Sequence, residues 1–451
     1  MLLRRSEPLL LTLALAFTVA AFTALTVAPA ARLMQWGSAS FSAGYLFSVV
    51  AWVGVAVAGQ FVLSRRLPHH DPILFPTIML LSGWGLALVW RLAPAFGLRQ
   101  TAWLTVAALG MIAVVVAPGD LRWLRRYRYL WLVSALGLTA LTLIVGINPS
   151  GGGPELWLGV GGMFFQPSEA LKLLFVVHLA AYLAEKTPLS LSPTPLRYGA
   201  AAPGTALRTR GTPEKRRGEG TDVTGNVSTY LAPLLLMWAL SLVLLISQRD
   251  LGTGSLIFAV FIVLLYLATG QKRYVVIGGA LLIVGAAVSY FLFDVVRLRV
   301  EAWIDPFADP SGRSFQIVQS LIAVANGGLF GRGFGVGAPT VIPVVHSDFV
   351  FAAIVEEWGL LGGVAAIALL LLLVSRGLRL ALLSQGNFRR LLAGGLAALL
   401  GLQSVLIVGG VIKVLPLTGV TLPFLSYGGS SLLINFIIAG LLLKLSDGAN
   451  Q

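Results

Sequence analysis

Four ionisable side chains lie within residues 342–359, where a polar segment runs into an apolar one. His346 and Asp348 stand just before a long apolar run, and Glu356 and Glu357 follow inside it. Charge at membrane depth costs roughly 2.5–3.5 kcal/mol per residue even on lenient insertion scales. Acids that are kept there point to chemistry, because desolvation raises the pKa of a carboxyl and suits it to accept a proton as a general base.

Each of these residues also has a structural interpretation. Asp348 could cap the helix predicted to start at Phe349 by accepting a backbone N–H, and from composition alone this cap is preferred. His346 could be a second base, could orient Asp348, or could be an ordinary loop histidine. Glu356 and Glu357 lie two turns further along the helix. Contact with a substrate or cation is open for them, as is a hydrogen-bond or ion-pair role inside a helix bundle.

Composition defines the class of protein that must position these groups. The chain has 451 residues, of which 57% are hydrophobic and 11% charged, and its mean hydropathy is +0.88. Soluble domains carry about 25% charged residues, so we expect an all-α, polytopic membrane protein. Cysteine is absent, which excludes disulfides, thiolate nucleophiles and Cys-ligated metals. The net charge of +14 is attributed to basic cytoplasmic loops, and nucleic acid is not expected as a partner.

Apolar runs of about 17–25 residues predict twelve membrane spans. They cover roughly 8–28, 44–63, 73–93, 101–118, 129–147, 168–184, 230–247, 252–269, 274–292, 349–374, 391–412 and 430–446. The first run, Leu9–Val27, lacks a convincing cleavage site and is interpreted as a retained span.

The distribution of basic residues predicts that both termini are cytoplasmic. With that orientation, 22 of the 32 Lys and Arg residues fall on the cytoplasmic side. Residues 186–228, rich in Pro, Gly, Thr and Arg, then form a disordered cytoplasmic loop whose basic residues can contact anionic membrane lipids. The polar clusters at 151–172, 248–250, 294–348 and 413–431 all fall outside. Their convergence on one face predicts a single outward-facing site.

Seven ordered motifs together resemble the SEDS family (RodA, FtsW, SpoVE). The motifs are Phe165-Gln-Pro-Ser-Glu-Ala-Leu-Lys172, Gln248-Arg-Asp-Leu-Gly252, Asp305-Pro-Phe307, Phe315-Gln-Ile-Val-Gln-Ser320, Gly327-Gly-Leu-Phe-Gly-Arg-Gly-Phe-Gly335, His346-Ser-Asp-Phe-Val-Phe-Ala352 and Pro423-Phe-Leu-Ser-Tyr-Gly-Gly-Ser-Ser431. The resemblance runs from about Asp71 to Asp447. It implies a ten-helix core that polymerises lipid II, the undecaprenyl-diphosphate-linked disaccharide peptide, in the bacterial cytoplasmic membrane.

The resemblance also implies how the chain is divided into regions and which protein it binds. Residues 1–67 form an extra helix pair, 68–185 and 229–451 the two parts of the core, and 294–348 a long outer segment. The extra pair and residues 416–419 favour a RodA-like member over a division protein. A class B penicillin-binding protein, a transpeptidase, is the expected partner. A divalent cation (Mg²⁺ or Mn²⁺) near the diphosphate is compatible with the chemistry, although the sequence contains no defined ligand set for one.

The activity that the resemblance implies, polymerisation of lipid II, suggests a role for each of the polar residues. Asp348 becomes the general base, and attack opposite the leaving diphosphate inverts the anomeric carbon. Glu169 and Lys172 are three apart on one helix, so they are neighbours. A lysine between Glu169 and Asp250 is a usual structural ion-pair set. The functional alternative is that Lys172 offsets the charge of the departing diphosphate.

Further substrate contacts are predicted in the outer segments. Arg299 and Arg313 could clamp the diphosphate, because guanidinium binds phosphate oxygens in a bidentate way, or they could be solvated loop residues. Gln316, His346, Ser426 and Ser430 are also predicted to contact substrate, the two serines within a re-entrant turn formed by residues 423–431.

Two positions depart from the family pattern. Leu156 stands where relatives often carry Arg, and Val344 or Val345 stands where many carry Glu, so an acceptor or diphosphate contact is either missing or supplied from elsewhere. The glycines of 327–335 are expected to allow tight turns or close helix contact rather than to bind a nucleotide. Two other functions remain open: a flippase for lipid II, which would need polar sites reachable from both faces, and a scaffold for a transpeptidase that has no need of Asp348.

Overall fold

The computed structural model describes residues 2–32, 34, 42–119, 121–149, 151, 154–186 and 227–449, and within this part the chain is almost entirely helical. The helices are α1 Leu2–Arg32, α2 Ala43–Arg66, α3 Leu74–Leu92, α4 Pro94–Val116, α5 Arg122–Arg126, α6 Arg128–Val145, α7 Pro167–Lys186, α8 Val227–Ser247, α9 Leu251–Thr269, α10 Lys272–Leu292, α11 Asp294–Ile304, α12 Phe315–Gly327, α13 Val350–Leu383, α14 Asn387–Val411 and α15 Gly429–Ala449. Short 3₁₀ segments cover Pro306–Ala308 and Pro339–Val341. The strands β1 Leu158–Val160 and β2 Met163–Phe165 form a hairpin in which Val160 pairs with Met163.

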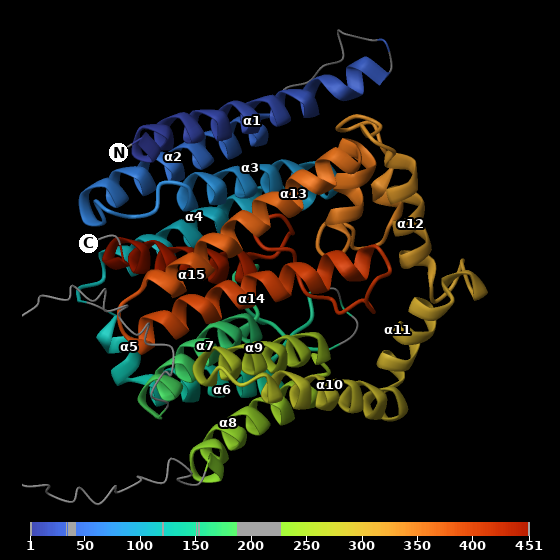
Figure 1. Ribbon diagram of the computed structural model, residues 1–451. Coiled ribbons are helices and arrows are strands. Elements are labelled where there is room, and N and C mark those ends of the chain that lie inside the picture. The colour runs from blue at the N-terminus through green and yellow to red at the C-terminus, as the bar shows by residue number, and fades with distance from the viewer. Residues whose placement is uncertain are drawn as a thin grey trace, which may run out of the picture.

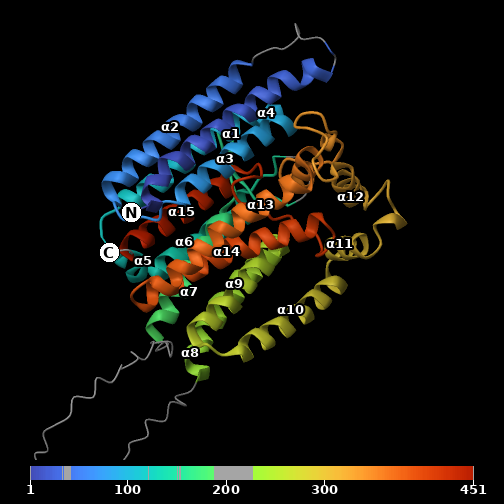
Figure 2. The same ribbon diagram turned by 45° about the horizontal axis from the view of Figure 1, so that its top comes forward.

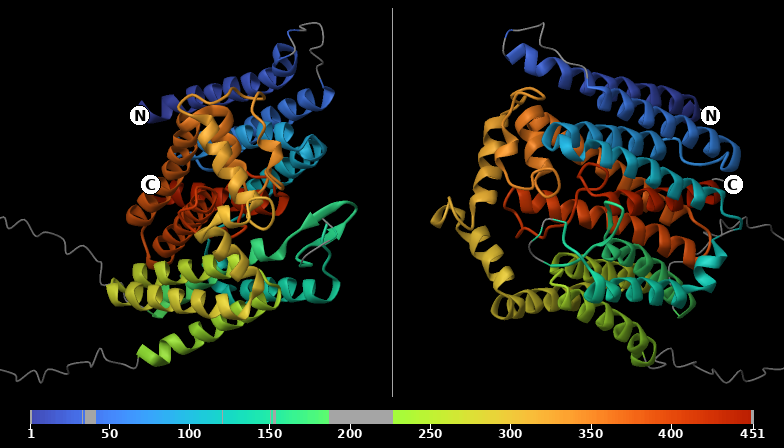
Figure 3. Two further views of the ribbon diagram at one scale, coloured as in Figure 1. Left: turned by 90° about the vertical axis from the view of Figure 1, so that its right-hand side faces the viewer. Right: turned by 180° about the vertical axis from the view of Figure 1, so that it is seen from behind.

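The long helices run side by side in one bundle, with both chain ends at one end of it (Figure 1). We call this end the terminal face and the opposite end, crossed by α11 and α12, the loop face. The hairpin β1–β2 projects away from the bundle (Figure 3). Because connecting segments with Gly, Pro and polar residues gather at the loop face, the polar motifs of the sequence are brought there from distant parts of the chain.

Eleven of the twelve predicted spans are confirmed. Eleven helices of the described part are long and apolar enough to cross a membrane. The span predicted at 230–247 corresponds to α8, which includes the shorter apolar helix Ala232–Ser247. Of the predicted loop 186–228, residues 187–226 lie outside the described part of the chain. The bundle therefore consists of the ten-helix core with α1 and α2 added at one edge, where Figure 2 shows them beside α3 and α4.

Polar bonds fix α2 on the core. Ser48 of α2 bonds Thr101 of α4 at 2.7 Å and accepts the Trp90 indole N–H at 2.8 Å. Trp52 donates to the Met79 carbonyl at 3.1 Å. Hydrogen bonds and close packing hold helices together in lipid, where apolar surface gains little by meeting apolar surface.

Helix α13 is broken at Gly359, which has φ 72° and ψ −174°. A broken helix leaves backbone groups without partners, and the glycine-rich segment 327–335 supplies them. The Arg332 and Gly333 amides donate to the Glu356 and Glu357 carbonyls at 2.9 and 3.0 Å, and the Leu360 amide donates to the Gly328 carbonyl at 2.9 Å. We call the glycine-rich segment and the α13 break together the α13 brace.

The brace requires glycine at several positions because a side chain there would collide with neighbouring backbone. A Cβ at Gly327 or Gly331 would collide with the carbonyls of Val355 or Glu357, and one at Gly359 with the Leu329 carbonyl. The prediction that these glycines allow close helix contact is confirmed. The brace fixes the direction of residues 350–358, the part of α13 that starts beside Asp348.

Candidate functional site

A cavity of about 690 Å³ opens at the loop face and is lined by all the main polar segments of that face. Helix α4, the hairpin, the start of α7, the start of α9, α11, the turn before α13 and the turn before α15 each contribute to it. Charged residues of the lining are Arg99, Glu169, Arg249, Asp250, Arg299 and Asp348. Polar and aromatic residues include Phe96, Trp103, Trp157, Gln166, Thr253, His346, Ser347, Thr421, Tyr427, Ser430 and Ser431.

Asp348 is half-buried in the cavity wall, in the turn that precedes α13. The Ser347 hydroxyl donates to its Oδ1 at 2.8 Å. Desolvation by the surrounding protein raises the pKa of the Asp348 carboxyl, and the Ser347 hydrogen bond and the Arg299 charge only partly oppose this effect. A carboxylate with a raised pKa, open to a cavity, is suited to take a proton from a bound hydroxyl.

The cap interpretation of Asp348 is wrong. Helix α13 begins at Val350, its cap residue is Phe349, and no side chain caps it. The Phe349 carbonyl accepts the amides of Ala352 and Ala353 instead. The Asp348 carboxylate is therefore not engaged by the helix end.

The turn that carries Asp348 is fastened to the turn before α15. Ser426 donates to the Ser347 carbonyl at 2.6 Å and accepts the Leu422 amide at 3.0 Å. The Tyr427 amide donates to the His346 carbonyl at 2.8 Å. Ser426 is buried and does not line the cavity, so its place in the structure is that of a support for the Asp348 turn.

His346 packs against aromatic rings rather than against Asp348. Its ring centroid lies 5.1 Å from that of Phe96 and 5.4 Å from that of Tyr427. Burial lowers the pKa of the His346 imidazole, so the ring is neutral at pH 7. Among the described residues, the hydrogen bond that orients the Asp348 carboxyl comes from Ser347.

The second polar set lies at the base of the cavity. Lys172 is fully buried and pairs with Glu169, with 2.7 Å between Nζ and Oε2. Asp250 caps α9 by accepting the Thr253 amide at 3.1 Å and also accepts the Ser168 hydroxyl at 3.0 Å. The predicted neighbours Glu169 and Lys172 are paired, whereas the recorded hydrogen-bond partners of Asp250 are Ser168 and Thr253.

Arginine side chains surround the cavity. Arg299 donates to the Thr418 carbonyl at 3.3 Å, and its Nη2 would lie 3.6 Å from a Cβ at Gly419, which in turn would lie 4.0 Å from Asp348 Oδ2. Arg99 and Arg249 also line the cavity, although neither is among the substrate contacts predicted from the sequence. Arg249 could have been predicted from its position inside the 248–250 motif. Arg99 could have been predicted because it is one of the few basic residues expected on the outer side.

Two predicted substrate contacts lie away from the cavity. Arg313 is exposed and lines a separate hollow of about 510 Å³ beside α11. Gln316 is half-buried on α12 and does not line the main cavity. Ser430, in contrast, lines it and accepts the Gln166 amide at 2.8 Å. The outer segment 294–348 thus contributes its start and its end to the site, but not the middle part that holds Arg313 and Gln316.

Glu356 and Glu357 both face the bundle. Glu357 pairs with Arg91 of α3 at 2.9 Å, and Arg91 also donates to the Gly337 carbonyl at 2.8 Å. Glu356 accepts the Ala338 amide at 3.0 Å. These contacts support the structural interpretation, in which both acids hold the brace.

Of the positions that depart from the family pattern, Leu156 and Val344 line the cavity, whereas Val345, the alternative to Val344, is buried and does not line it. Leu156 brings no charge to the wall, and Arg99 and Arg249 stand in the same wall from other elements. Val344 has φ 57°, a left-handed conformation that is strained for a β-branched residue. Within the described part of the chain, no group of three or more His, Asp or Glu side chains has a metal-binding arrangement.

Fold and site together define a multi-pass membrane protein with a charged cavity at the end of its helix bundle. Residues 73–451 match the family of cell cycle proteins FtsW, RodA and SpoVE. The chain is 36% identical to the peptidoglycan glycosyltransferase RodA of Mycobacterium tuberculosis over 99% of this chain and 91% of that protein. It is 34% identical to a probable peptidoglycan glycosyltransferase FtsW of Geobacter metallireducens, over 75% and 82%.

Solved structures show the same fold. The Thermus thermophilus rod shape determining protein RodA superposes with a TM-score of 0.58 at 25% identity, over 85% of this chain and 98% of that one. A chain described under "Structural coordination of polymerization and crosslinking by a peptidoglycan synthase complex" gives 0.55 at 29% identity, over 89% and 97%. The protein belongs to the FtsW/RodA/SpoVE family, is RodA-like, and is a peptidoglycan glycosyltransferase.

Proposed function

We propose that the protein polymerises lipid II into glycan strands, with inversion at the anomeric carbon and Asp348 as the general base. The observation that carries this proposal is the position of Asp348. Its carboxyl opens into a charged cavity, is oriented by Ser347, and is not used by the helix that follows. The loop face is then the outer face of the bacterial cytoplasmic membrane, in agreement with the basic residues predicted on the cytoplasmic side.

The reaction needs one proton acceptor and one site for a leaving diphosphate. Asp348 takes the proton of the acceptor sugar hydroxyl while that oxygen attacks the anomeric carbon of the donor. The bond from this carbon to the diphosphate oxygen breaks, and the lipid diphosphate leaves with the electron pair. Because attack and departure occur on opposite faces of the sugar, the configuration inverts. The proton on Asp348 returns to water through the cavity.

The arginines of the cavity supply the positive charge for the diphosphate. Arg99, Arg249 and Arg299 line the same cavity as Asp348. Guanidinium groups bind phosphate oxygens through paired, charge-assisted hydrogen bonds. Lys172 is buried beneath the surface, so we assign it to Glu169, which lines the cavity, rather than to the diphosphate directly. A divalent cation could add charge through the diphosphate itself.

A class B penicillin-binding protein is the proposed partner, because a glycan polymerase needs a transpeptidase to cross-link its product. The similarity to a chain from a peptidoglycan synthase complex supports this proposal. A RodA-like member would act in cell elongation and shape. The ionic and polar cavity described above lies at the loop face, as a polymerase that acts at one membrane face requires.

The decisive experiment is glycan synthesis by the purified full-length protein supplied with lipid II. The wild type is expected to produce polymer, and Asp348→Asn to produce none while remaining folded. Transport of lipid II across vesicle membranes is measured with the same two preparations. A protein that moves lipid II but makes no glycan would replace the polymerase with the flippase, and Asp348→Asn with wild-type polymerisation would remove Asp348 from the role of base.

A further inference from the structure

The added helix α1 contacts the same part of α13 that leads to the Asp348 turn. The ring of Phe17 lies 5.5 Å from that of Trp358 and 5.6 Å from that of Trp84, centroid to centroid. Trp84 and Trp358 are 5.7 Å apart, and Phe334 of the glycine-rich segment lies 5.2 Å from Trp358. One aromatic cluster therefore joins α1, α3, α13 and the glycine-rich segment.

This cluster sits at the break in α13. Trp358 directly precedes Gly359, and Phe334 directly precedes Gly335. Nearer the loop face, a Cβ at Gly335 would lie 2.9 Å from the Ala28 Cβ of α1. Helix α1 thus packs against both halves of the α13 brace.

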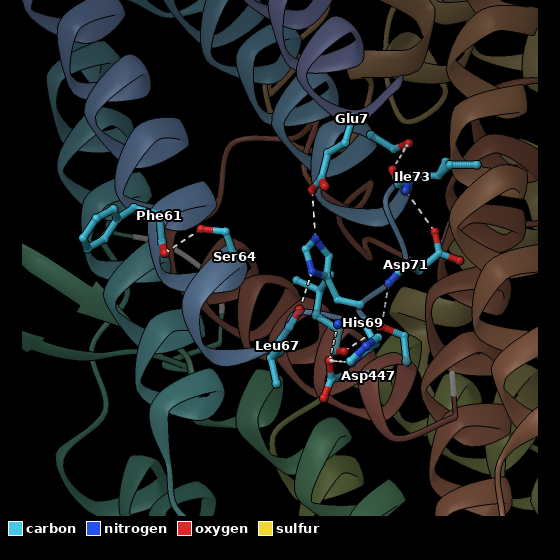
Figure 4. A network of polar contacts seen from close by, with 12 residues as sticks. Glu7, Phe61, Ser64, Leu67, His69, Asp71, Ile73 and Asp447 are labelled. Atoms are coloured by element: carbon cyan, nitrogen blue, oxygen red, sulfur yellow. Dashed lines mark hydrogen bonds and ion pairs between the residues drawn. The ribbon is translucent and has the colours of Figure 1, made fainter. Parts of the chain in front are cut away.

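The terminal-face ends of α1 and α13 are held by the same polar network, part of which Figure 4 shows. Glu7 of α1 bonds His70 at 2.8 Å, and both side chains are buried. The neighbouring residue Asp71 pairs with Arg376 of α13 at 3.5 Å, and its amide donates to the Ser446 hydroxyl of α15 at 2.9 Å. Helix α1 is therefore fixed at one end to the loop that anchors α13, and along its length to the brace.

We propose that α1 is a positioning element for the catalytic site: Phe17 acts through Trp358 to fix residues 350–358 of α13 and, with them, the Asp348 turn. This inference rests on the proposed role of Asp348 as the base. Phe17 touches neither the cavity nor Asp348, so it is a positioning residue and not a catalytic one. The extra helix pair then contributes to catalysis from outside the family core.

The expected effect falls on turnover rather than on substrate affinity. Misplacement of a catalytic group by about 1 Å can lower the rate roughly 100-fold. Most of the cavity wall belongs to α4, α7, α9, the hairpin and the turn before α15, and Phe17 is not part of the cavity lining. Loss of the Phe17 ring is therefore expected to lower kcat by about 10-fold or more and to leave KM for lipid II close to that of the wild type.

The test compares full-length Phe17→Ala with Phe17→Tyr and Leu13→Ala, with kcat and KM for lipid II measured on purified protein. Phe17→Tyr keeps the ring and should restore kcat. Leu13, one turn earlier on α1, is 57% exposed, so Leu13→Ala should leave kcat unchanged. The pH profile of Phe17→Ala should keep the ascending limb of the wild type, because the same base acts.

A cross-link between α1 and α3 supplies a second measurement, in which the oxidised and reduced forms of one variant are compared with each other. A Cβ at Gly83 would lie 3.3 Å from Thr18 Cβ, close to the separation of about 3.8 Å found in disulfides, and the chain has no other cysteine. Thr18→Cys/Gly83→Cys should keep the same kcat when oxidised as when reduced, because a positioning helix does not move during turnover.

Several outcomes would overturn the inference. Wild-type kcat in Phe17→Ala, an equal loss in Leu13→Ala, or a loss of activity that only follows the loss of folded protein would each reduce α1 to a structural addition. Abolition of turnover by the oxidised cross-link would show that α1 must move. A failure of Asp348 as base is recognised separately, by polymerisation in Asp348→Asn, whatever Phe17→Ala does.

Discussion

At the scale of single residues, the site depends on the Asp348 carboxyl, which is not used to cap the helix that follows it. Within the described part of the chain, this carboxyl receives a side-chain hydrogen bond from Ser347 alone. Most acids near a helix start are stabilised by its amides and have low pKa values. Here burial has the opposite effect on the Asp348 pKa. The rate of glycan synthesis should therefore rise with pH through a value above that of an ordinary carboxyl.

The same shift makes a prediction about stability. A folded-state pKa above the unfolded value means that the folded protein binds the proton more tightly. The contribution of Asp348 to stability is thus present at pH below about 3.9, the unfolded value, and is lost as pH rises to the folded pKa. Asp348→Asn, which can still accept the Ser347 hydroxyl, should be inactive yet at least as thermally stable as the wild type at pH 7.5. A lower Tm for this variant at neutral pH would contradict the assignment of the shift.

The buried pair below the cavity gives a second residue-scale prediction. Lys172→Met leaves Glu169 buried without its cation, and breaking such a pair typically costs about 3–5 kcal/mol. The double variant Lys172→Met/Glu169→Gln removes both charges and should recover most of the thermal stability. Thermal unfolding in detergent measures both. An unchanged Tm in Lys172→Met would show that the pair contributes little to folding.

At the scale of elements, the break in α13 determines where the Asp348 turn lies. Gly359 has a backbone conformation that is essentially restricted to glycine, and a Cβ there would also collide with the Leu329 carbonyl. Gly359→Ala should cost at least about 1–3 kcal/mol of stability and lower the polymerisation rate. Gly279→Ala is the matched control, because α10 leaves open space at that position and alanine favours a helix there. Equal Tm values for the two variants would refute the role of the brace.

The sequence predicts part of this arrangement and leaves the rest open for a physical reason. Long apolar runs are local features, so the spans and the position of Asp348 at the start of one of them could be read directly. The Glu169–Lys172 pair also followed from local helical spacing. The partner of Glu357, however, is Arg91, and the brace joins residues 328–333 to 356–361. Such contacts depend on how distant helices pack, which hydropathy does not encode.

The same limit explains where the structure and the predicted site differ. Arg313 was placed in the predicted site because it lies in the outer segment with Arg299, yet α11 and α12 carry it to a different hollow. Arg99 lies in the first turns of α4, belongs to none of the motifs, and reaches the cavity through the packing of that helix. Proximity in three dimensions, rather than membership of the outer loops, decides which cations surround Asp348.

At the scale of the whole molecule, the added pair and the core form one packed unit. The match to the mycobacterial RodA extends over 99% of the chain and so takes in most of residues 1–67. Buried polar bonds cross the boundary, including Glu7–His70 and Ser48–Thr101. Within lipid, a buried polar group that loses its partner finds no water to replace it. The pair therefore stabilises the core as well as touching the brace.

Deletion of residues 1–67 tests whether the helix pair and the core act as one unit. The truncated protein should still insert with the remaining ten spans correctly oriented, because the basic cluster 122–128 and later loops retain the charge bias. His70 and Thr101 would lose partners, so Tm should fall, and loss of Phe17 should lower kcat to about the level of Phe17→Ala. Glycan synthesis should remain measurable, because the deletion removes no residue of the cavity lining. Protease protection of the loops reports orientation, and polymerisation of lipid II reports activity. A truncation that inserts correctly with wild-type Tm and kcat would separate the pair from the working enzyme, whereas complete inactivity would mean that the pair does more than position α13.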